Sequence, residues 1–285
     1  MLGLGAGVAA RPVPAVGTTD LWKLAGLVLV VVDHTGLFFL ADEAWWRVVG
    51  RLAAPIFFFL VGYARSSAVP WTWLALGAAL TATDHLTSDD PSETALNILL
   101  NFTLLRTALP HIEAWITGAA GRAGEARSEA WRTAALVAAL IALVPALDPH
   151  LEYGAEGWLW ALFGLWQRLA GENAAPGSVV PGSASSWRGW VRAGVGLAAA
   201  LVYTWREILD YEFEGAQAWV LALLVAGLAA ALARFRRAAL RRQPSPALAR
   251  PLAVAGRHSL EIYAVSLFAM QVTAHLLGVG TETEG

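Results

Sequence analysis

The chain contains no cysteine among its 285 residues and is poor in charged side chains. The absence of cysteine excludes disulfide bonds, thiolate metal sites and a cysteine acyl-enzyme intermediate. Charged residues make up 15% of the chain and hydrophobic residues 57%, whereas soluble domains carry about 25% charged residues. Residues 1–17 also lack the basic stretch and long apolar run of a secretory signal peptide, so none is expected. What the chain has in excess is apolar runs, which recur along nearly its whole length.

These runs predict an all-α, polytopic bundle of about nine membrane-spanning helices. The predicted spans are residues 20–40, 48–67, 70–87, 95–117, 131–148, 157–171, 187–206, 215–235 and 258–278. Their ends are uncertain by about 2–4 residues, and the third and sixth are short for a bilayer that needs about 20 residues, so either one could be broken or tilted. We expect a single transmembrane domain at 20–278, a cytoplasmic tail at 1–19, an outer tail at 279–285 and a flexible cytoplasmic linker at 172–186.

The charges between the predicted spans alternate in sign along the chain. Arginines dominate one set of connections, and the richest of these is the loop from Arg234 to Arg250 before the last span. Acidic residues dominate the other set, for example at Asp84–Glu93 and at Asp210–Glu214. Because basic loops remain in the cytoplasm, this pattern predicts a cytoplasmic N-terminus and an outer C-terminus, which requires an odd number of spans.

Two adjacent ionisable residues, Asp33 and His34, lie inside the first predicted span. A charged residue near the middle of such a helix costs about 2.5–3.5 kcal/mol on insertion scales, so it indicates a functional site. Adjacent helical side chains point about 100° apart, so each of the two needs a partner from another helix. Histidine is the side chain best suited to proton transfer near neutral pH, which favours a catalytic role over a structural pair that joins helices.

Two arginines in other spans are candidate partners or ligand-binding groups. Arg51 enters the second span at about the depth of Asp33, so an ion pair between them is plausible. The alternative is that the Arg51 side chain extends to the outer membrane–water interface. Arg106 lies near the middle of the fourth span, which also carries Asn97 and Asn101. A central arginine needs either a carboxylate or an anionic ligand, and the sequence leaves both open.

The remaining polar groups lie at the ends of spans. Glu152 and Tyr153 precede the sixth span, and Arg257, His258 and Ser259 begin the last one, where helix capping and ligand binding explain them equally well. The arginine-rich loop before them could hold a phosphorylated cofactor or anionic lipid headgroups. Pairs such as Asp84-His85 lack the spacing of a metal site, so we expect neither a metal nor a nucleic-acid partner. The sequence does not decide the oligomeric state.

Several of these residues fall into motifs. The motifs are Lys23-Leu-Ala-Gly with Val32-Asp33-His34-Thr-Gly36, Gly50-Arg51-Leu-Ala-Ala-Pro55-Ile-Phe with Gly62-Tyr63, Asn97-Ile-Leu-Leu, Glu152-Tyr153-Gly154-Ala-Glu-Gly157 and Gly256-Arg257-His-Ser259-Leu-Glu-Ile-Tyr263. Together they resemble the TraX family over most of residues 21–270, most specifically in the first two spans. The chain departs from the family pattern at Glu152, where Asp is usual. In the last span it lacks a histidine often found near Val265–Leu267 in the related acyltransferase-3 proteins.

The resemblance implies a multi-pass acetyltransferase of the bacterial cytoplasmic membrane. TraX proteins transfer acetyl groups, the type member to the N-terminus of conjugative pilin. The wider group, which includes acyltransferase-3 proteins and heparan-alpha-glucosaminide N-acetyltransferase, takes the acetyl group from cytoplasmic acetyl-CoA. The resemblance therefore implies that the partners of this chain are membrane lipid, the acyl donor CoA and an acceptor peptide or glycan.

On this hypothesis, His34 is a general base, or less favoured a transient acetyl carrier, and Asp33 fixes the local charge. The acceptor side is assigned to Arg51, Asn97, Asn101, Glu152 and Tyr153. The CoA side is assigned to Arg106, Arg257, His258 and Ser259. The alternative is a proton-coupled transporter in which Asp33, His34 and Arg106 form a relay.

Overall fold

The computed structural model describes residues 15–87, 95–118, 126–172 and 184–278. Within these ranges the chain is all-α, as predicted, with no strand beyond two isolated β-bridges. The predicted outer tail, most of the predicted linker and residues 1–14 of the N-terminal tail lie outside the described residues. The helices are α1 (Thr18–Phe39), α2 (Ala44–Gly50), α3 (Ala53–Tyr63), α4 (Trp71–Thr87), α5 (Ile98–Thr117), α6 (Ala126–Leu147), α7 (Gly154–Glu172), α8 (Ala184–Asp210), α9 (Ala216–Leu232), α10 (Pro246–Arg257) and α11 (Ser259–Leu277).

Each predicted span overlaps a helix or, for the second span, a pair of helices. Among the described residues, four helical segments are long and apolar enough to cross a membrane, and α9 is a shorter apolar helix. The four segments are Thr18–Phe39, Ala44–Tyr63, Arg127–Leu147 and Ser259–Leu277. The chain is therefore a membrane protein, while the count of nine spans stays a prediction.

The structure corrects three details of the predicted boundaries. The second span is the one that is interrupted, between α2 and α3 at Arg51-Leu52. The third and sixth spans, whose short lengths suggested a break or a tilt, contain the continuous helices α4 and α7. The segment from Pro246 to Arg257, expected to be part of a loop, forms the amphipathic helix α10, which begins with proline in its first turn. Helix α8 begins at Ala184, inside the range predicted as a linker.

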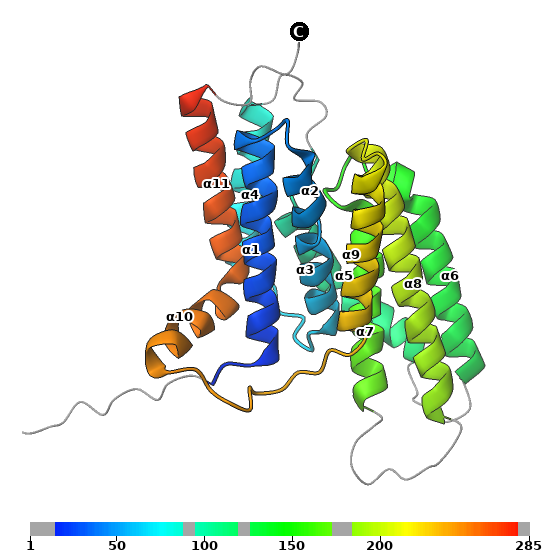
Figure 1. Cartoon of the computed structure of the whole chain (residues 1–285). Helices are drawn as coiled ribbons and strands as arrows, with labels where there is room; N and C mark the ends of the chain where they lie inside the picture. Colours follow the sequence, from blue (N-terminus) through cyan, green and yellow to red (C-terminus); the bar gives the residue numbers. More distant parts are fainter. Residues whose placement is uncertain (1–14, 88–94, 119–125, 173–183, 279–285) are drawn as a thin grey trace, which may run out of the picture.

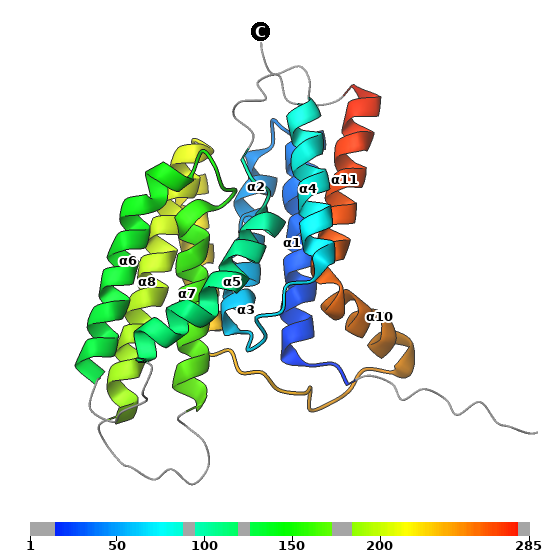
Figure 2. The same cartoon turned by 180° about the vertical axis from the view of Figure 1, so that it is seen from behind.

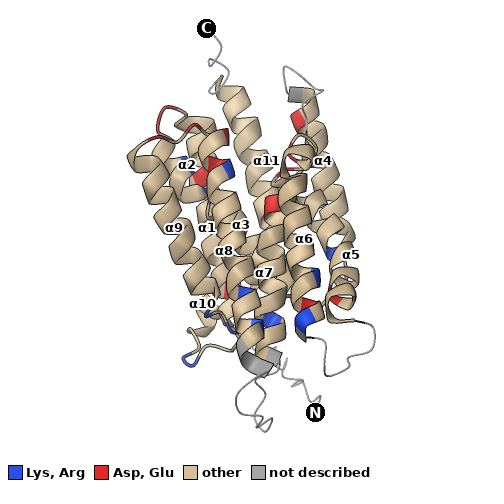
Figure 3. Ribbon diagram, turned by 90° about the vertical axis from the view of Figure 1, so that its right-hand side faces the viewer, with Lys and Arg blue, Asp and Glu red and all other residues tan. Residues whose placement is uncertain are grey.

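The helices run between two ends of the molecule (Figures 1 and 2). Helix α1 starts at the end where α10 lies, and α11 finishes at the opposite end (Figure 1). Most basic side chains lie at the α10 end and most acidic ones toward the other (Figure 3), so the alternation seen in the sequence is also a separation in space. This separation is of the kind that the positive-inside rule uses, and the orientation in the membrane stays a prediction.

Helix α3 occupies the centre of the bundle and packs against α1, α5 and α7. Every residue from Ala53 to Gly62 is buried. Its backbone approaches that of α7 closely, because a Cβ atom at Gly62 would overlap the carbonyl of Ala161, and one at Gly164 would overlap the carbonyl of Phe59. Small residues at such crossings are what allows membrane helices to pack this tightly.

Candidate functional site

Asp33 lies at the centre of a buried cluster of charges. Arg47 donates a hydrogen bond from Nη1 to Asp33 Oδ2 at 2.7 Å, and Arg51 donates from Nε to Oδ1 at 2.9 Å and from Nη2 to Oδ2. Asp33 is only 3% exposed. The Arg51 Nε atom is also 3.7 Å from a carboxylate oxygen of Glu207. The predicted Asp33–Arg51 pair is confirmed, and the cluster holds two cations and two carboxylates, so its formal charges cancel.

The break between α2 and α3 places Arg51 in this cluster. Arg51 follows the last residue of α2, and the Tyr203 hydroxyl donates to its backbone carbonyl at 2.5 Å. Gly50 lies directly against the backbone of Asp33, where a Cβ atom would overlap Asp33 itself. Arg51 Nη1 also donates to the hydroxyl oxygen of Tyr211 at 2.7 Å. The helix break therefore directs the guanidinium toward α1 and α8.

Sequence reasoning missed Arg47, Tyr203, Glu207 and Tyr211 as members of this cluster. Arg47 had a detectable signal, because it lies four residues before Arg51 and so shares a helical face with it. No spacing within the sequence connects the α8 residues with α1, since that contact depends on how distant helices pack.

His34 does not bond to its neighbour Asp33 but to its own helix. Its Nδ1 atom is 2.9 Å from the carbonyl oxygen of Val30. A carbonyl can only accept, so in the neutral ring the proton sits on Nδ1 and the lone pair on Nε2. The ring stacks on Phe38 and meets Tyr263 edge-on, with centroids 6.0 and 6.1 Å away. These contacts fix the ring and leave Nε2 as the atom able to accept a proton.

A small cavity joins His34 to Glu152 and Tyr153, two of the five acceptor-side residues predicted from the sequence. It measures about 20 Å³ and is lined by Val30, Asp33, His34, Gly50, Ala53, Ala54, Phe57, Ile98, Phe102, Glu152, Tyr153, Leu260 and Tyr263. A cavity needs about 10–15 Å³ to hold one water molecule, so this one has room for about one. It brings residues of α1, α2, α3, α5 and α11 together with the turn before α7.

Asn97 and Asn101 support this cavity from behind rather than line it. Asn101 Nδ2 donates to the carbonyl of Glu152 at 2.8 Å, and Asn97 Oδ1 caps α5 by accepting from the Leu99 amide at 3.0 Å. The Glu152 carboxylate accepts from the Ile98 amide at 2.8 Å. Both asparagines are buried, at 3% and 0% exposed. They therefore hold the turn that carries Glu152 against the start of α5.

Tyr153 has an unusual backbone for its size. Its φ of +58° lies in the left-handed region, which bulky residues rarely adopt and which costs about 1–3 kcal/mol. The ring lies 5.7 Å from the Arg51 guanidinium and stacks on Tyr203. The strained turn directs this ring between the ion cluster and the small cavity, just before α7 begins at Gly154.

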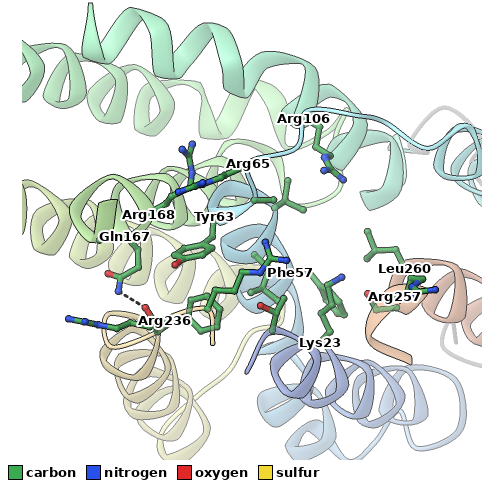
Figure 4. A pocket seen from close by; sticks show the side chains of 18 of the residues that line it. Lys23, Phe57, Tyr63, Arg65, Arg106, Gln167, Arg168, Arg236, Arg257 and Leu260 are labelled. Atoms are coloured by element: carbon green, nitrogen blue, oxygen red, sulfur yellow. Dashed lines mark hydrogen bonds between the residues drawn. The ribbon is translucent and has the colours of Figure 1, made fainter. Parts of the chain in front are cut away.

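A second, much larger cavity opens at the basic end of the molecule and measures about 960 Å³ (Figure 4). Its walls come from the start of α1, the end of α3, the end of α7, the segment after α9 and the start of α11, with single residues from α4, α5, α8 and α10. The cationic residues that line it are Lys23, Arg65, Arg106, Arg168, Arg192, Arg236, Arg237 and Arg257. Glu261 is the one acidic residue among the described residues of its lining, so the cavity is strongly positive.

Among the residues that line this cavity, Arg106 is the clearest candidate to bind an anion. Its Nη2 atom donates to the Ser66 carbonyl at 2.6 Å, and its guanidinium lies 5.1 Å over Trp73. Its buried Nε atom has no hydrogen-bond partner. Within the described ranges no carboxylate forms a salt bridge with Arg106, unlike Arg168, which pairs with Glu113 at 2.6 Å. Of the two possibilities left by the sequence, these contacts favour an anionic ligand.

The other residues predicted to bind the cofactor do not all line this cavity. Arg257 and Ser259 line the large cavity, whereas His258 is exposed at the junction of α10 and α11 and is not part of the lining. Sequence reasoning did not assign Lys23 to this site, although its Nζ donates to the Gly256 carbonyl at 2.8 Å and so connects α1 with the α10–α11 junction.

No group of three histidine or acidic residues that could hold a metal ion occurs in the described part of the chain. The family model for TraX protein matches residues 18–181, more than half of the chain. The chain belongs to the TraX family. No curated protein and no solved structure matches it. In this TraX-family chain, the matched region contains Asp33, His34, Arg47, Arg51, Arg106, Glu152 and Tyr153. The cluster residues Tyr203, Glu207 and Tyr211 lie beyond it, as do α10 and α11.

Proposed function

We propose that this chain is an integral-membrane acetyltransferase that takes an acetyl group from acetyl-CoA. The observation that carries the proposal is the meeting of two cavities. The large basic cavity and the small cavity beside His34 share Phe57 and Leu260 as lining residues. A donor held by its phosphates in the large cavity would therefore have its reactive end directed toward the histidine.

The charge and size of the large cavity suit the CoA part of the donor. Guanidinium groups bind phosphates through paired, charge-assisted hydrogen bonds, and CoA carries several phosphates. The volume of about 960 Å³ is at the upper end of the range of about 300–1,000 Å³ typical of ligand pockets. Arg106 and Arg257 would contact the phosphates, together with Lys23 and the arginines after α9. The location at the basic end agrees with a donor that comes from the cytoplasm.

The transfer step uses the free lone pair of His34. The nitrogen or oxygen of the acceptor attacks the thioester carbonyl carbon, the new C–N or C–O bond forms, and the C–S bond breaks. His34 Nε2 takes the proton from the attacking atom and returns it to the CoA sulfur, which leaves as the free thiol. No proton is gained or lost by the protein over the complete step.

The ion cluster would act as the support of this site. Asp33, held by Arg47 and Arg51, fixes the position of α1 and so of the adjacent His34. Glu152 and Tyr153 line the small cavity but not the large one, so they would contact the acceptor rather than the donor. The acceptor would be an amine or hydroxyl at the membrane, such as a pilin-like N-terminus or an envelope glycan. The protein would reside in the bacterial cytoplasmic membrane with its N-terminus in the cytoplasm.

Transfer of a labelled acetyl group tests this proposal. Membranes that contain the full chain are incubated with acetyl-CoA labelled in the acetyl group, and label in envelope material is measured. His34→Gln is expected to lower transfer by about 10²–10⁴-fold, because it removes the general base. His275→Gln changes an exposed histidine in the last turn of α11 and serves as the matched control. Wild-type transfer rates in both variants would contradict the role of His34.

The alternative is a proton-coupled transporter, and donor binding separates the two functions. Acetyl-CoA at 100 times its dissociation constant should stabilise the purified acetyltransferase by about 2.7 kcal/mol, whereas a transporter of another solute would show no shift in melting temperature. Arg106→Gln should reduce the shift. Arg250→Gln, an exposed arginine of α10 outside the large cavity, should leave it unchanged.

A further inference from the structure

Phe57 and Leu260 form a thin partition between the two cavities. Among the described residues they are the only two that line both the large basic cavity and the small cavity beside His34. Phe57 lies within α3 and Leu260 in the first turn of α11, and they are 5% and 6% exposed. The route from the large cavity to His34 that these linings define therefore passes between these two side chains.

The partition is packed tightly on the side of α1. A Cβ atom at Gly26 would lie 2.8 Å from the Phe57 ring, so the ring already occupies the space that a larger residue of α1 would fill. Because the ring cannot move toward α1 without a clash, the width of the passage depends on Phe57 and on Leu260 opposite.

The space beyond the partition is very small. The small cavity measures about 20 Å³, and its far walls include Ile98, Phe102 and Tyr263, which are 5%, 1% and 5% exposed. An acetyl group has three non-hydrogen atoms and is already larger than the one water molecule for which this cavity has room, so the walls must adjust to admit it. An acyl chain with further methylene groups would have to displace side chains that are packed against the core.

We propose that Phe57 and Leu260 select the acyl donor by chain length, admitting acetyl and rejecting longer acyl groups. This inference rests on the acyl transfer proposed above and adds the residues that limit the length of the acyl chain. Pocket walls of this kind discriminate by about 10–200-fold for each methylene group. The wild-type chain should therefore use acetyl-CoA at least about tenfold faster than propionyl-CoA, and butyryl-CoA more slowly still.

The release of free CoA from each donor tests the proposal. The purified full-length chain is supplied in turn with acetyl-, propionyl- and butyryl-CoA together with envelope extract as acceptor, and the free thiol is measured. Because the chain has no cysteine, it adds no protein thiol to the signal. Leu260→Ala and the conservative Phe57→Leu should each raise the ratio of the propionyl to the acetyl rate by about tenfold or more, since each widens the passage.

Leu60→Ala is the matched control. Leu60 is the same residue type as Leu260 and is similarly buried, at 7% against 6% exposed, but it lines the large cavity and not the small one. The same truncation at this position should leave the propionyl to acetyl ratio unchanged, even if it alters donor binding.

The outcomes separate this inference from the proposed function. Equal wild-type rates with all three donors, or the same change of ratio in Leu60→Ala as in Leu260→Ala, would overturn chain-length selection while acyl transfer itself stands. Failure of the wild-type chain to consume any of the three donors would instead overturn the proposed function. The wild-type series tests the chain-length preference even if one variant does not fold, and the remaining variant tests whether the partition causes it.

Discussion

At the scale of single residues, the fold depends on a buried carboxylate that two arginines share. Asp33→Asn would leave Arg47 and Arg51 buried with only Glu207 to compensate them, and removal of one partner from a buried ion pair costs about 3–5 kcal/mol. Chemical denaturation of the purified protein should show a loss of this size. Asp42→Asn, the same change at an exposed residue, should alter the free energy of unfolding by less than about 0.5 kcal/mol. A similar stability for both variants would contradict the role given to Asp33.

Much of this site could be predicted from residue types alone. A charged residue inside an apolar run needs a partner, and this argument was sufficient to predict the Asp33–Arg51 pair. The argument could not find Glu207 and Tyr203, because both lie on α8 and reach the site only through the packing of helices distant in sequence. The tautomer of His34 could not be predicted from the sequence either, because it depends on the contact with the Val30 carbonyl.

At the scale of elements, the close crossing of α3 and α7 holds the site together. A methyl group at Gly164 would overlap the Phe59 carbonyl, so Gly164→Ala should force the helices apart and cost about 1–3 kcal/mol. Gly227→Ala on α9 meets no atom within 4 Å and should be neutral or stabilising by up to about 1 kcal/mol. Thermal unfolding of both variants measures the difference. A Gly164→Ala protein as stable as Gly227→Ala would show that the crossing is looser than described.

Element boundaries were less predictable than element positions. The apolar runs located a helix in each predicted range, because burial in a membrane needs long apolar segments. Periodicity did not locate the break at Arg51-Leu52, since the residues on both sides are helical and apolar. Helix α10 was missed for the opposite reason. Its arginines assigned it to the basic loop, whereas Pro246 begins a helix whose buried residues Ala249 and Gly256 lie on one side.

At the scale of the whole molecule, the separation of charge predicts the orientation in the membrane. The absence of native cysteine makes single cysteines clean reporters of this orientation. Glu214→Cys, between α8 and α9 at the acidic end, should react with a membrane-impermeant maleimide in intact cells whose outer membrane has been made permeable. Ser245→Cys, just before α10 at the basic end, should react only after the membrane is opened. Labelling of Ser245→Cys in sealed cells would reverse the proposed topology.

The central claim is that an acetyl group passes from a donor at the basic end to an acceptor beside His34. The most direct measurement uses sealed vesicles of known orientation, with labelled acetyl-CoA added only to the outside. Inside-out vesicles expose the basic end, so they should transfer label to acceptor material, and His34→Gln should abolish this transfer. Right-side-out vesicles should transfer none, because acetyl-CoA does not cross the membrane. Transfer only in right-side-out vesicles, or equal transfer by His34→Gln, would contradict the account.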